Sequence, residues 1–127
     1  MTTTPIGEIT IQMLAMPANT NANGDIFGGW LVSNMDLASS VLAKKISHDR
    51  TATVAIEAMH FLEPVHVGDV VSCYVNLVKI GNTSMTIDVE AWKETFLTNE
   101  KACVTKGRFI FVAIDDKGRP RQVPQSA

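Results

Sequence analysis

The amino-acid sequence predicts a two-layer α+β domain, in which one long helix lies across one face of an antiparallel sheet of about five strands. Three observations support this fold class. A single segment has helical periodicity, five segments have the composition or alternation of strands, and the last four strands follow one another with short connections. Strands with short connections pair antiparallel, and one helix against one sheet makes two layers.

The N-terminal part of the chain contains a strand, a loop and the helix. Ile9, Ile11 and Met13 alternate with polar residues, which predicts the first strand. Residues 16–25 are rich in Pro, Asn, Thr and Gly and predict a loop. Residues 28–47 carry apolar side chains at positions i, i+4, i+7 and i+11, which predicts the helix. This helix is apolar for a surface helix, so we expect the sheet to curl around it.

The rest of the chain has strand character. Alternating, β-branched or apolar residues predict four more strands, at residues 51–62, 70–80, 85–92 and 101–114. Residues 81–83, with the sequence Gly-Asn-Thr, predict a hairpin turn. Residues 119–127 contain two prolines and two glutamines and predict a flexible tail.

Length and composition fit a small soluble protein. The 127 residues suit one domain over residues 1–127, and 46% of them are hydrophobic, which is ample for a core. The net charge of −2 offers no basic face for a nucleic acid. There is no apolar run near the ~20 residues of a membrane span and no secretory signal. We expect a cytoplasmic protein without membrane or nucleic-acid partners, whose small size favours self-association.

Several common catalytic motifs are absent. The sequence contains no GxSxG, P-loop, GxGxxG or HExxH motif. His48, His60 and His66 are scattered, so structural or solvated roles are expected for them. Cys73 and Cys103 lie far apart in predicted strands and are expected to be reduced thiols. The sequence therefore predicts neither a metal site nor a serine–histidine triad.

Polar residues and glycines concentrate where the loop meets the helix, from Asn21 to Trp30. Gly28 and Gly29 are poor helix formers, each costing about 1 kcal/mol relative to Ala inside a helix. A close approach of the backbone to a bound group would explain them. The free N–H groups of a helix start could receive a developing oxyanion. A plain glycine-rich entry turn is the alternative.

Asp36 is a carboxylate among apolar helix neighbours. It shares a helical stripe with Ser33, Ser40 and Lys44, so an ordinary solvated face is one explanation. The other explanation is a general base, because burial beneath the sheet or a second subunit would raise the pKa of its carboxyl group. The residues alone leave both open.

An NxxGxxFGGW motif over residues 21–30 is followed by Met35 and Asp36. Together with residues 16–20, this stretch strongly resembles the signature of the bacterial YciA-type acyl-CoA thioesterases. The resemblance covers about residues 10–122 and includes residues 54–61, 64, 67–71, 81–84 and 109–113. It implies the hotdog fold, a long helix wrapped by a curved antiparallel sheet. It also implies homodimers with a continuous sheet, often assembled as trimers of dimers.

The resemblance implies hydrolysis of acyl-CoA to free fatty acid and coenzyme A, in a site between two protomers. Asp36 matches the catalytic carboxylate, as general base or nucleophile. Asn21 matches an asparagine that faces this carboxylate from the partner subunit and orients water or the carbonyl. The backbone N–H groups of Gly28 and Gly29 would polarise the thioester carbonyl. A turn near bound coenzyme A is matched by Gly81, Asn82, Thr83 and Ser84. No cofactor is implied, because coenzyme A is part of substrate and product.

Two departures and two alternatives accompany this interpretation. Residues 37–40, with the sequence Leu-Ala-Ser-Ser, stand where the family is often richer in glycine and alanine. Asn82 stands where an arginine is common, so other basic residues such as Lys79, Lys106 or Arg108 are candidates to hold the phosphates. A hotdog dehydratase or hydratase would use a histidine paired with an acid, and the loop–helix junction contains no histidine. A non-catalytic sensor of acyl-CoA or a nucleotide would use the same cleft but would gain nothing from a carboxylate beside a polyanion.

Overall fold

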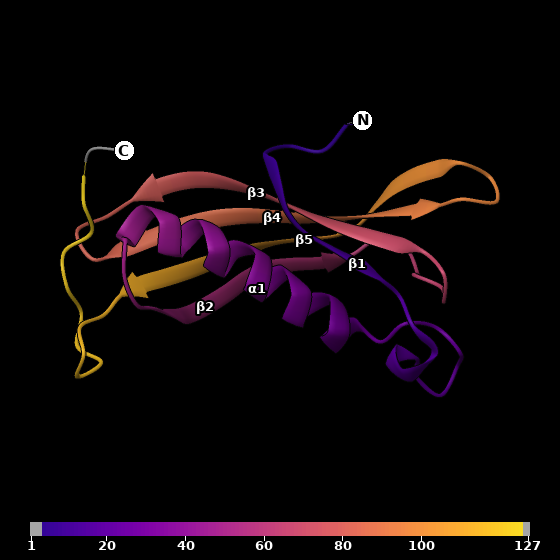
Figure 1. Cartoon of the computed structure of the whole chain (residues 1–127), viewed down its shortest axis with the longest axis horizontal. Helices are drawn as coiled ribbons and strands as arrows, with labels where there is room; N and C mark the ends of the chain where they lie inside the picture. Colours follow the sequence, from indigo (N-terminus) through magenta and orange to yellow (C-terminus); the bar gives the residue numbers. More distant parts are fainter. Residues whose placement is uncertain (1–3, 126–127) are drawn as a thin grey trace.

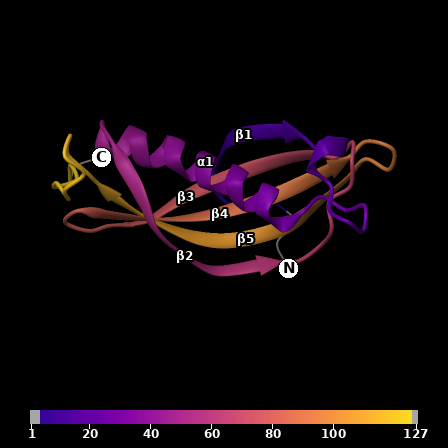
Figure 2. The ribbon, with the colours of Figure 1, turned by 90° about the horizontal axis from the view of Figure 1, so that it is seen from below.

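The computed structural model describes residues 4–125 and confirms the predicted α+β architecture. Its elements are β1 (Glu8–Leu14), the short 3-10 helix η1 (Pro17–Asn19), α1 (Gly28–Ser47), β2 (Thr51–Phe61), β3 (Val70–Ile80), β4 (Ser84–Thr95) and β5 (Glu100–Ala113). The five strands form one sheet in the order β1-β3-β4-β5-β2, and every neighbouring pair is antiparallel. Helix α1 runs across one face of this sheet, and the strands bend around it (Figures 1 and 2).

The core lies between α1 and the concave face of the sheet. The alternation predicted for residues 85–92 is confirmed, because Met85, Ile87, Val89 and Ala91 are all fully buried beneath the helix. The helix contributes Leu31, Met35 and Ala38 to the same core, as its periodicity predicts. Val41 is exposed, because the face of the helix that carries Met35, Ser39 and Ala43 is the one that packs on the sheet.

The C-terminal segment is ordered over residues 119–125, so the prediction of a flexible tail is wrong there; residues 126 and 127 lie outside the described residues. Val123 is completely buried in the hydrophobic core. The guanidinium group of Arg121 donates to the backbone carbonyls of Ser47 at the end of α1, of Arg50 just before β2 and of Ile114 just after β5. The buried side chain of Val123 and these hydrogen bonds hold the segment against the rest of the protein, although its composition is typical of a loop.

The two edges of the sheet differ. At one edge, β1 has seven residues, with one register irregularity, and at the other edge β2 has eleven residues, with two. Both strands expose apolar side chains, including Ile9 on β1 and Val54 and Ile56 on β2. An unpaired edge strand with exposed apolar side chains is a template for pairing with another chain. Because β2 is the longer edge, it is the better candidate for self-association.

Among the helices of residues 4–125, none combines the length and hydropathy that a membrane crossing requires. The same residues contain no group of three or more His, Cys, Asp or Glu side chains arranged to hold a metal ion. Both cysteines are free thiols, Cys73 buried and Cys103 half-buried.

The thiol of Cys73 is expected to be inert in the native protein at pH 8. Burial raises its pKa to about 12, so the reactive thiolate is scarce. Titration with a thiol-reactive chromogenic disulfide should detect at most one thiol per chain in the native state. Two thiols should react after denaturation in guanidinium. Rapid reaction of both thiols in the folded protein would contradict the burial of Cys73.

Candidate active site

Helix α1 begins without a side-chain cap. Phe27 occupies the N-cap position with an extended backbone, and its carbonyl accepts a hydrogen bond from Trp30 N at 3.1 Å. The N–H groups of Gly28 and Gly29 find no acceptor within residues 4–125. These two donors, at the positive end of the helix dipole, are suited to stabilise an oxyanion.

Two aromatic rings explain why the helix begins with glycines. A Cβ atom at Gly28 would lie 3.1 Å from Cε1 of Phe61, and a Cβ atom at Gly29 would lie 3.2 Å from the ring of Phe27. These distances are tighter than ordinary van der Waals contact. The glycines therefore allow both rings to pack onto the helix start, and they keep the two N–H groups accessible.

Asn21 anchors the loop that precedes the helix. Its Oδ1 accepts hydrogen bonds from Asn23 N at 2.9 Å and Asp25 N at 3.2 Å, and its own N–H donates to Asp25 O at 2.7 Å. Asp25 in turn contacts His66, with 3.4 Å between Oδ1 and Nε2. The amide oxygen of Asn21 is thus occupied by the loop. The Nδ2 group remains as the donor that the side chain can offer to a ligand.

A cavity of about 410 Å³ lies between this loop, the helix start and the segment that follows β2. Its lining combines mainly apolar side chains with a few polar groups, and comprises Asn21, Asp25, Ile26, Gly28, Leu31, Phe61, Leu62, Glu63, Pro64 and Val65. A concave, mainly apolar pocket with a few placed polar groups is the usual form of a small-molecule site.

Asp36 is half-buried in the middle of α1 and has a specific partner. Thr53 of β2 donates its hydroxyl hydrogen bond to Asp36 Oδ1 at 2.7 Å. No donor within residues 4–125 contacts Oδ2. A carboxylate with one oxygen held and the other free is arranged as a base or nucleophile. The sequence contains no local signal for Thr53, because the contact joins residues 17 positions apart in different elements.

One protomer does not bring the predicted site residues together. Asn21 and Gly28 line the same cavity, and Gly29 follows on the helix, but Asp36 does not line it. Eight residues separate Gly28 from Asp36, which corresponds to about 12 Å along a helix.

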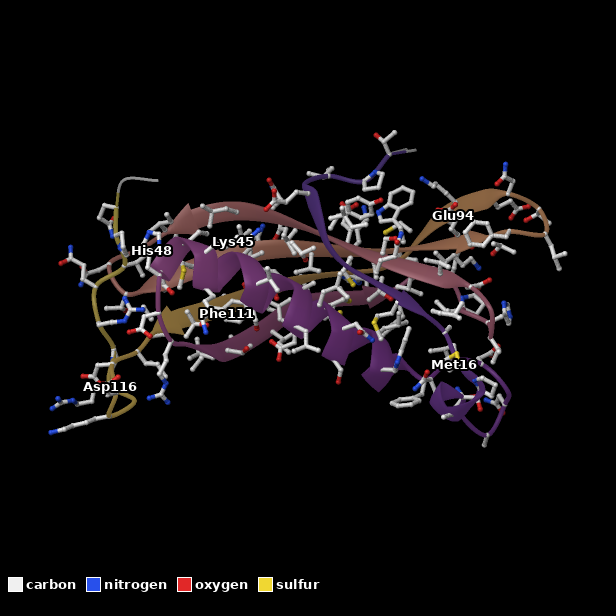
Figure 3. All side chains as sticks on the ribbon, viewed as in Figure 1. Met16, Lys45, His48, Glu94, Phe111 and Asp116 are labelled. Carbon is white, nitrogen blue, oxygen red and sulfur yellow. The ribbon has the colours of Figure 1, made fainter. Side chains whose placement is uncertain are left out.

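The turn between β3 and β4, residues 81–84, lies near the end of α1 rather than its start (Figures 1 and 2). Figure 3 labels both ends of the molecule, with Met16 near the helix start and His48 and Asp116 near the helix end. Among the basic residues considered for phosphate binding, Arg108 is held by Asp88 in a two-point ion pair, at 2.7 and 3.1 Å.

Comparison with known proteins identifies the family. The sequence model of the thioesterase superfamily matches residues 23–97. The acyl-CoA thioester hydrolase YciA of Salmonella typhimurium is 50% identical over 98% of this chain and 96% of its own length. The crystal structure of the hexameric thioesterase y2039 from Yersinia pestis is 47% identical, covers 97% of this chain and 100% of its own, and superposes with a TM-score of 0.93.

A more distant structure bears on the site residues. The acyl-CoA hydrolase of Staphylococcus aureus was solved as an aspartate-to-alanine mutant, at 26% identity and a TM-score of 0.82, covering 90% of this chain and 70% of that one. It was also solved as a threonine-to-alanine mutant. The two mutated residues are 17 positions apart, which is the separation of Asp36 and Thr53 here.

The chain belongs to the thioesterase superfamily and, within it, to the family of YciA-type acyl-CoA thioester hydrolases. The resemblance recognised in the sequence is thereby confirmed. The helix wrapped by a five-stranded antiparallel sheet is the hotdog fold, which a related thioesterase of Campylobacter jejuni also has.

Two substitutions of Asn21 test whether its side-chain oxygen Oδ1 stabilises the loop. Asn21→Asp keeps an acceptor for the backbone N–H groups of Asn23 and Asp25, so the melting temperature should stay within about 2 °C of the wild type. Asn21→Ala removes that acceptor and should lower the free energy of unfolding by about 1 kcal/mol. Thermal melts of the three proteins measure this. Equal stability of Asn21→Ala and wild type would contradict the anchoring role.

Proposed function

We propose that the protein hydrolyses acyl-CoA thioesters. One observation carries this proposal: the two free N–H donors at the start of α1 lie beside a largely apolar cavity of about 410 Å³. Such a cavity suits an acyl chain, and the donors suit the oxygen of its thioester carbonyl. The family assignment and the names of the relatives support the same substrate class.

We propose that each active site is formed by two protomers paired through β2. Two-fold pairing of this edge with a second copy is antiparallel and places the end of one β2 beside the beginning of the other. Phe61 at the end of β2 packs on Gly28, and Thr53 near its beginning holds Asp36. The pairing therefore carries the helix start of one protomer toward Asp36 of its partner.

The same two-fold pairing also determines which protomer would supply each remaining part of the site. Asn21 belongs to the protomer that provides Gly28 and Gly29, because all three lie at the helix start. The turn at residues 81–84 belongs to the protomer that provides Asp36, because this turn lies toward the end of α1 (Figure 2). A continuous sheet across the two-fold axis keeps both helices on one face.

The proposed reaction is attack by water on the thioester carbonyl. Asp36 Oδ2 accepts a proton from the water, whose oxygen bonds to the carbonyl carbon. The charge that develops on the carbonyl oxygen is stabilised by the N–H groups of Gly28 and Gly29 and by Nδ2 of Asn21. The carbon–sulfur bond then breaks, and the thiolate of coenzyme A leaves without a strong acid, since thiols ionise near pH 8.5. Direct attack by Asp36, giving a mixed anhydride that water hydrolyses, uses the same geometry.

The proposal extends to assembly, cofactor and compartment. The relative from Yersinia pestis is described as hexameric, and three dimers paired through β2 would give a hexamer with six sites. The proposed chemistry requires no metal or redox cofactor. We place the protein in the cytoplasm, where its two free thiols would remain reduced.

Replacing Asp36 tests the proposed activity directly. Asp36→Ala should lower kcat by at least about 100-fold, because a positioned base contributes 10²–10⁴-fold. The measurement is thiol release from acyl-CoAs of short to long chain, with circular dichroism and coenzyme A binding as controls for folding and for an intact cleft. Absence of turnover by the wild type on every acyl-CoA, with coenzyme A still bound, would favour the sensor. Full activity of Asp36→Ala would exclude the carboxylate as the base.

Thr53 is expected to position Asp36. Thr53→Val is close in shape but removes the donor to Asp36 Oδ1, so kcat should fall by about tenfold, as expected for a lost hydrogen bond to a charged group. Thr53→Ser keeps the hydroxyl and should retain most of the activity. Equal activity of the valine and serine variants would show that the hydrogen bond does not matter for the reaction.

A further inference from the structure

The C-terminal segment of the chain, residues 119–125, makes specific contacts with the turn at residues 81–84. Val123 N donates to Asn82 O at 2.9 Å, and Gln125 Nε2 donates to Gly81 O at 3.1 Å. The side chain of Val123 is 0% exposed and forms part of the hydrophobic core. The segment therefore lies across the turn as a strap, with its apolar anchor in the core and its polar groups on the turn.

The strap is fixed at its other end as well. Arg121 donates three hydrogen bonds, to Ile114 O at 2.9 Å, Ser47 O at 3.2 Å and Arg50 O at 3.3 Å. Its backbone N–H also donates to Ala113 O at 2.9 Å. These bonds join the end of α1, the end of β5 and the strap into one unit. The strap thus connects the turn to the helix that carries Asp36.

The backbone carbonyls of the first three residues of the turn all accept hydrogen bonds. Gly81 O and Asn82 O accept from the strap, and Thr83 O accepts from Ala113 N at 2.9 Å. Gly81 N closes the turn by donating to Ser84 O at 2.8 Å. A Cβ atom at Gly81 would lie 2.6 Å from Ser84 Oγ, so a larger residue there would require this hydroxyl to rotate away. The backbone shape is set by these contacts, and the exposed side chain of Asn82 remains free for a ligand.

We propose that the strap is a positioning device that holds the turn at residues 81–84 in the shape that receives the nucleotide part of acyl-CoA. This inference rests on the proposed function. In the proposed site, the thioester lies at the helix start of the partner protomer. The turn lies toward the end of α1 in the protomer that provides Asp36 (Figure 1). A group that contacts the turn is thus remote from the reacting carbonyl, and in acyl-CoA that group is the phosphorylated adenosine.

The physical advantage of the strap is preorganisation. A glycine-containing hairpin turn without external contacts samples several backbone shapes, and a ligand must then supply the free energy to order it. The contacts from Val123 and Gln125 order the turn before the ligand arrives. Because Asn82 carries no charge, the turn must bind phosphate or ribose through hydrogen bonds, whose strength depends on geometry. Loss of the strap should therefore weaken binding and leave the chemical step unchanged.

Two variants and a matched control test the strap in the full-length protein. Val123→Asp places a carboxylate in an apolar site and should release the strap, because an unpaired buried charge is strongly unfavourable. Gln125→Ala removes one hydrogen bond to the turn from an exposed side chain and carries little risk to folding. Gln122→Ala is the control, since Gln122 is an exposed glutamine of the same segment.

The readout is the separation of KM from kcat on two substrates, an acyl-CoA and the matching acyl-pantetheine, which lacks the nucleotide. We expect KM for acyl-CoA to rise about tenfold in Val123→Asp and about threefold in Gln125→Ala, with kcat within twofold of the wild type and Gln122→Ala unaffected. For acyl-pantetheine, kcat/KM should not change in any variant.

Three outcomes would overturn the strap's role. KM for acyl-CoA could remain at the wild-type value in both variants, or kcat/KM for the two substrates could fall equally, or Gln122→Ala could match Gln125→Ala. Failure of the proposed function is distinguishable from these, because the wild type would then turn over neither substrate.

Discussion

The packing of one long helix lengthwise across the concave face of a five-stranded sheet governs the arrangement of the whole molecule. A helix of 20 residues is about 30 Å long, so groups at its start, middle and end cannot meet within one chain. The start offers two free backbone N–H groups and the loop anchored by Asn21. The middle offers Asp36, and the turn at residues 81–84 lies toward the end. In the proposed dimer, each protomer holds complementary parts of a site, and an antiparallel pairing through β2 would bring them together.

Electrostatic preorganisation follows from the same packing. The helix start has no side-chain cap, and the glycines there keep its N–H donors available for a ligand. Leaving donors unpaired at a helix start costs stability, and the buried core formed by Met35, Met85, Ile87 and Phe109 offsets that cost. The hydroxyl of Thr53 fixes one oxygen of Asp36 without neutralising its charge. Stability thus comes from the helix–sheet core, and the reactive groups lie at its margins.

The fold was predictable from the sequence because its signals are local. The alternation at residues 85–92 and the helical repeat at residues 28–47 each reflect which face of an element meets the core, and both are confirmed. The ordered strap was not predictable, since Val123 is one apolar residue in a segment of loop composition and its burial depends on a pocket built by distant elements. The partnership of Thr53 with Asp36 was missed for the same reason.

The site, too, has features that the sequence indicated and features that it did not. Asn21, Gly28 and Gly29 were singled out by their crowded polar and glycine-rich stretch, and the structure brings Asn21 and Gly28 to one cavity. Which oxygen or nitrogen of Asn21 is available could not be read from sequence, because the loop's backbone decides it. The proposed action of Asp36 on the cavity of another protomer depends on assembly, which no pattern within one chain encodes.

The central claim, a site shared between two protomers, is tested most directly by mixing two variants, each expected to be inactive because it lacks one proposed site residue. Asp36→Ala and Asn21→Ala subunits, carrying different affinity tags, would be co-expressed and the mixed oligomers purified and assayed for thiol release from acyl-CoA. A mixed dimer has one site with both substitutions and one site with neither. With random pairing inside the oligomer, about half of the dimers are mixed, and each mixed dimer has one intact site of two. The mixed oligomers should therefore show about one quarter of wild-type activity. Mixed oligomers as inactive as either parent would contradict the shared site and place Asp36 and Asn21 in the same protomer's reaction centre.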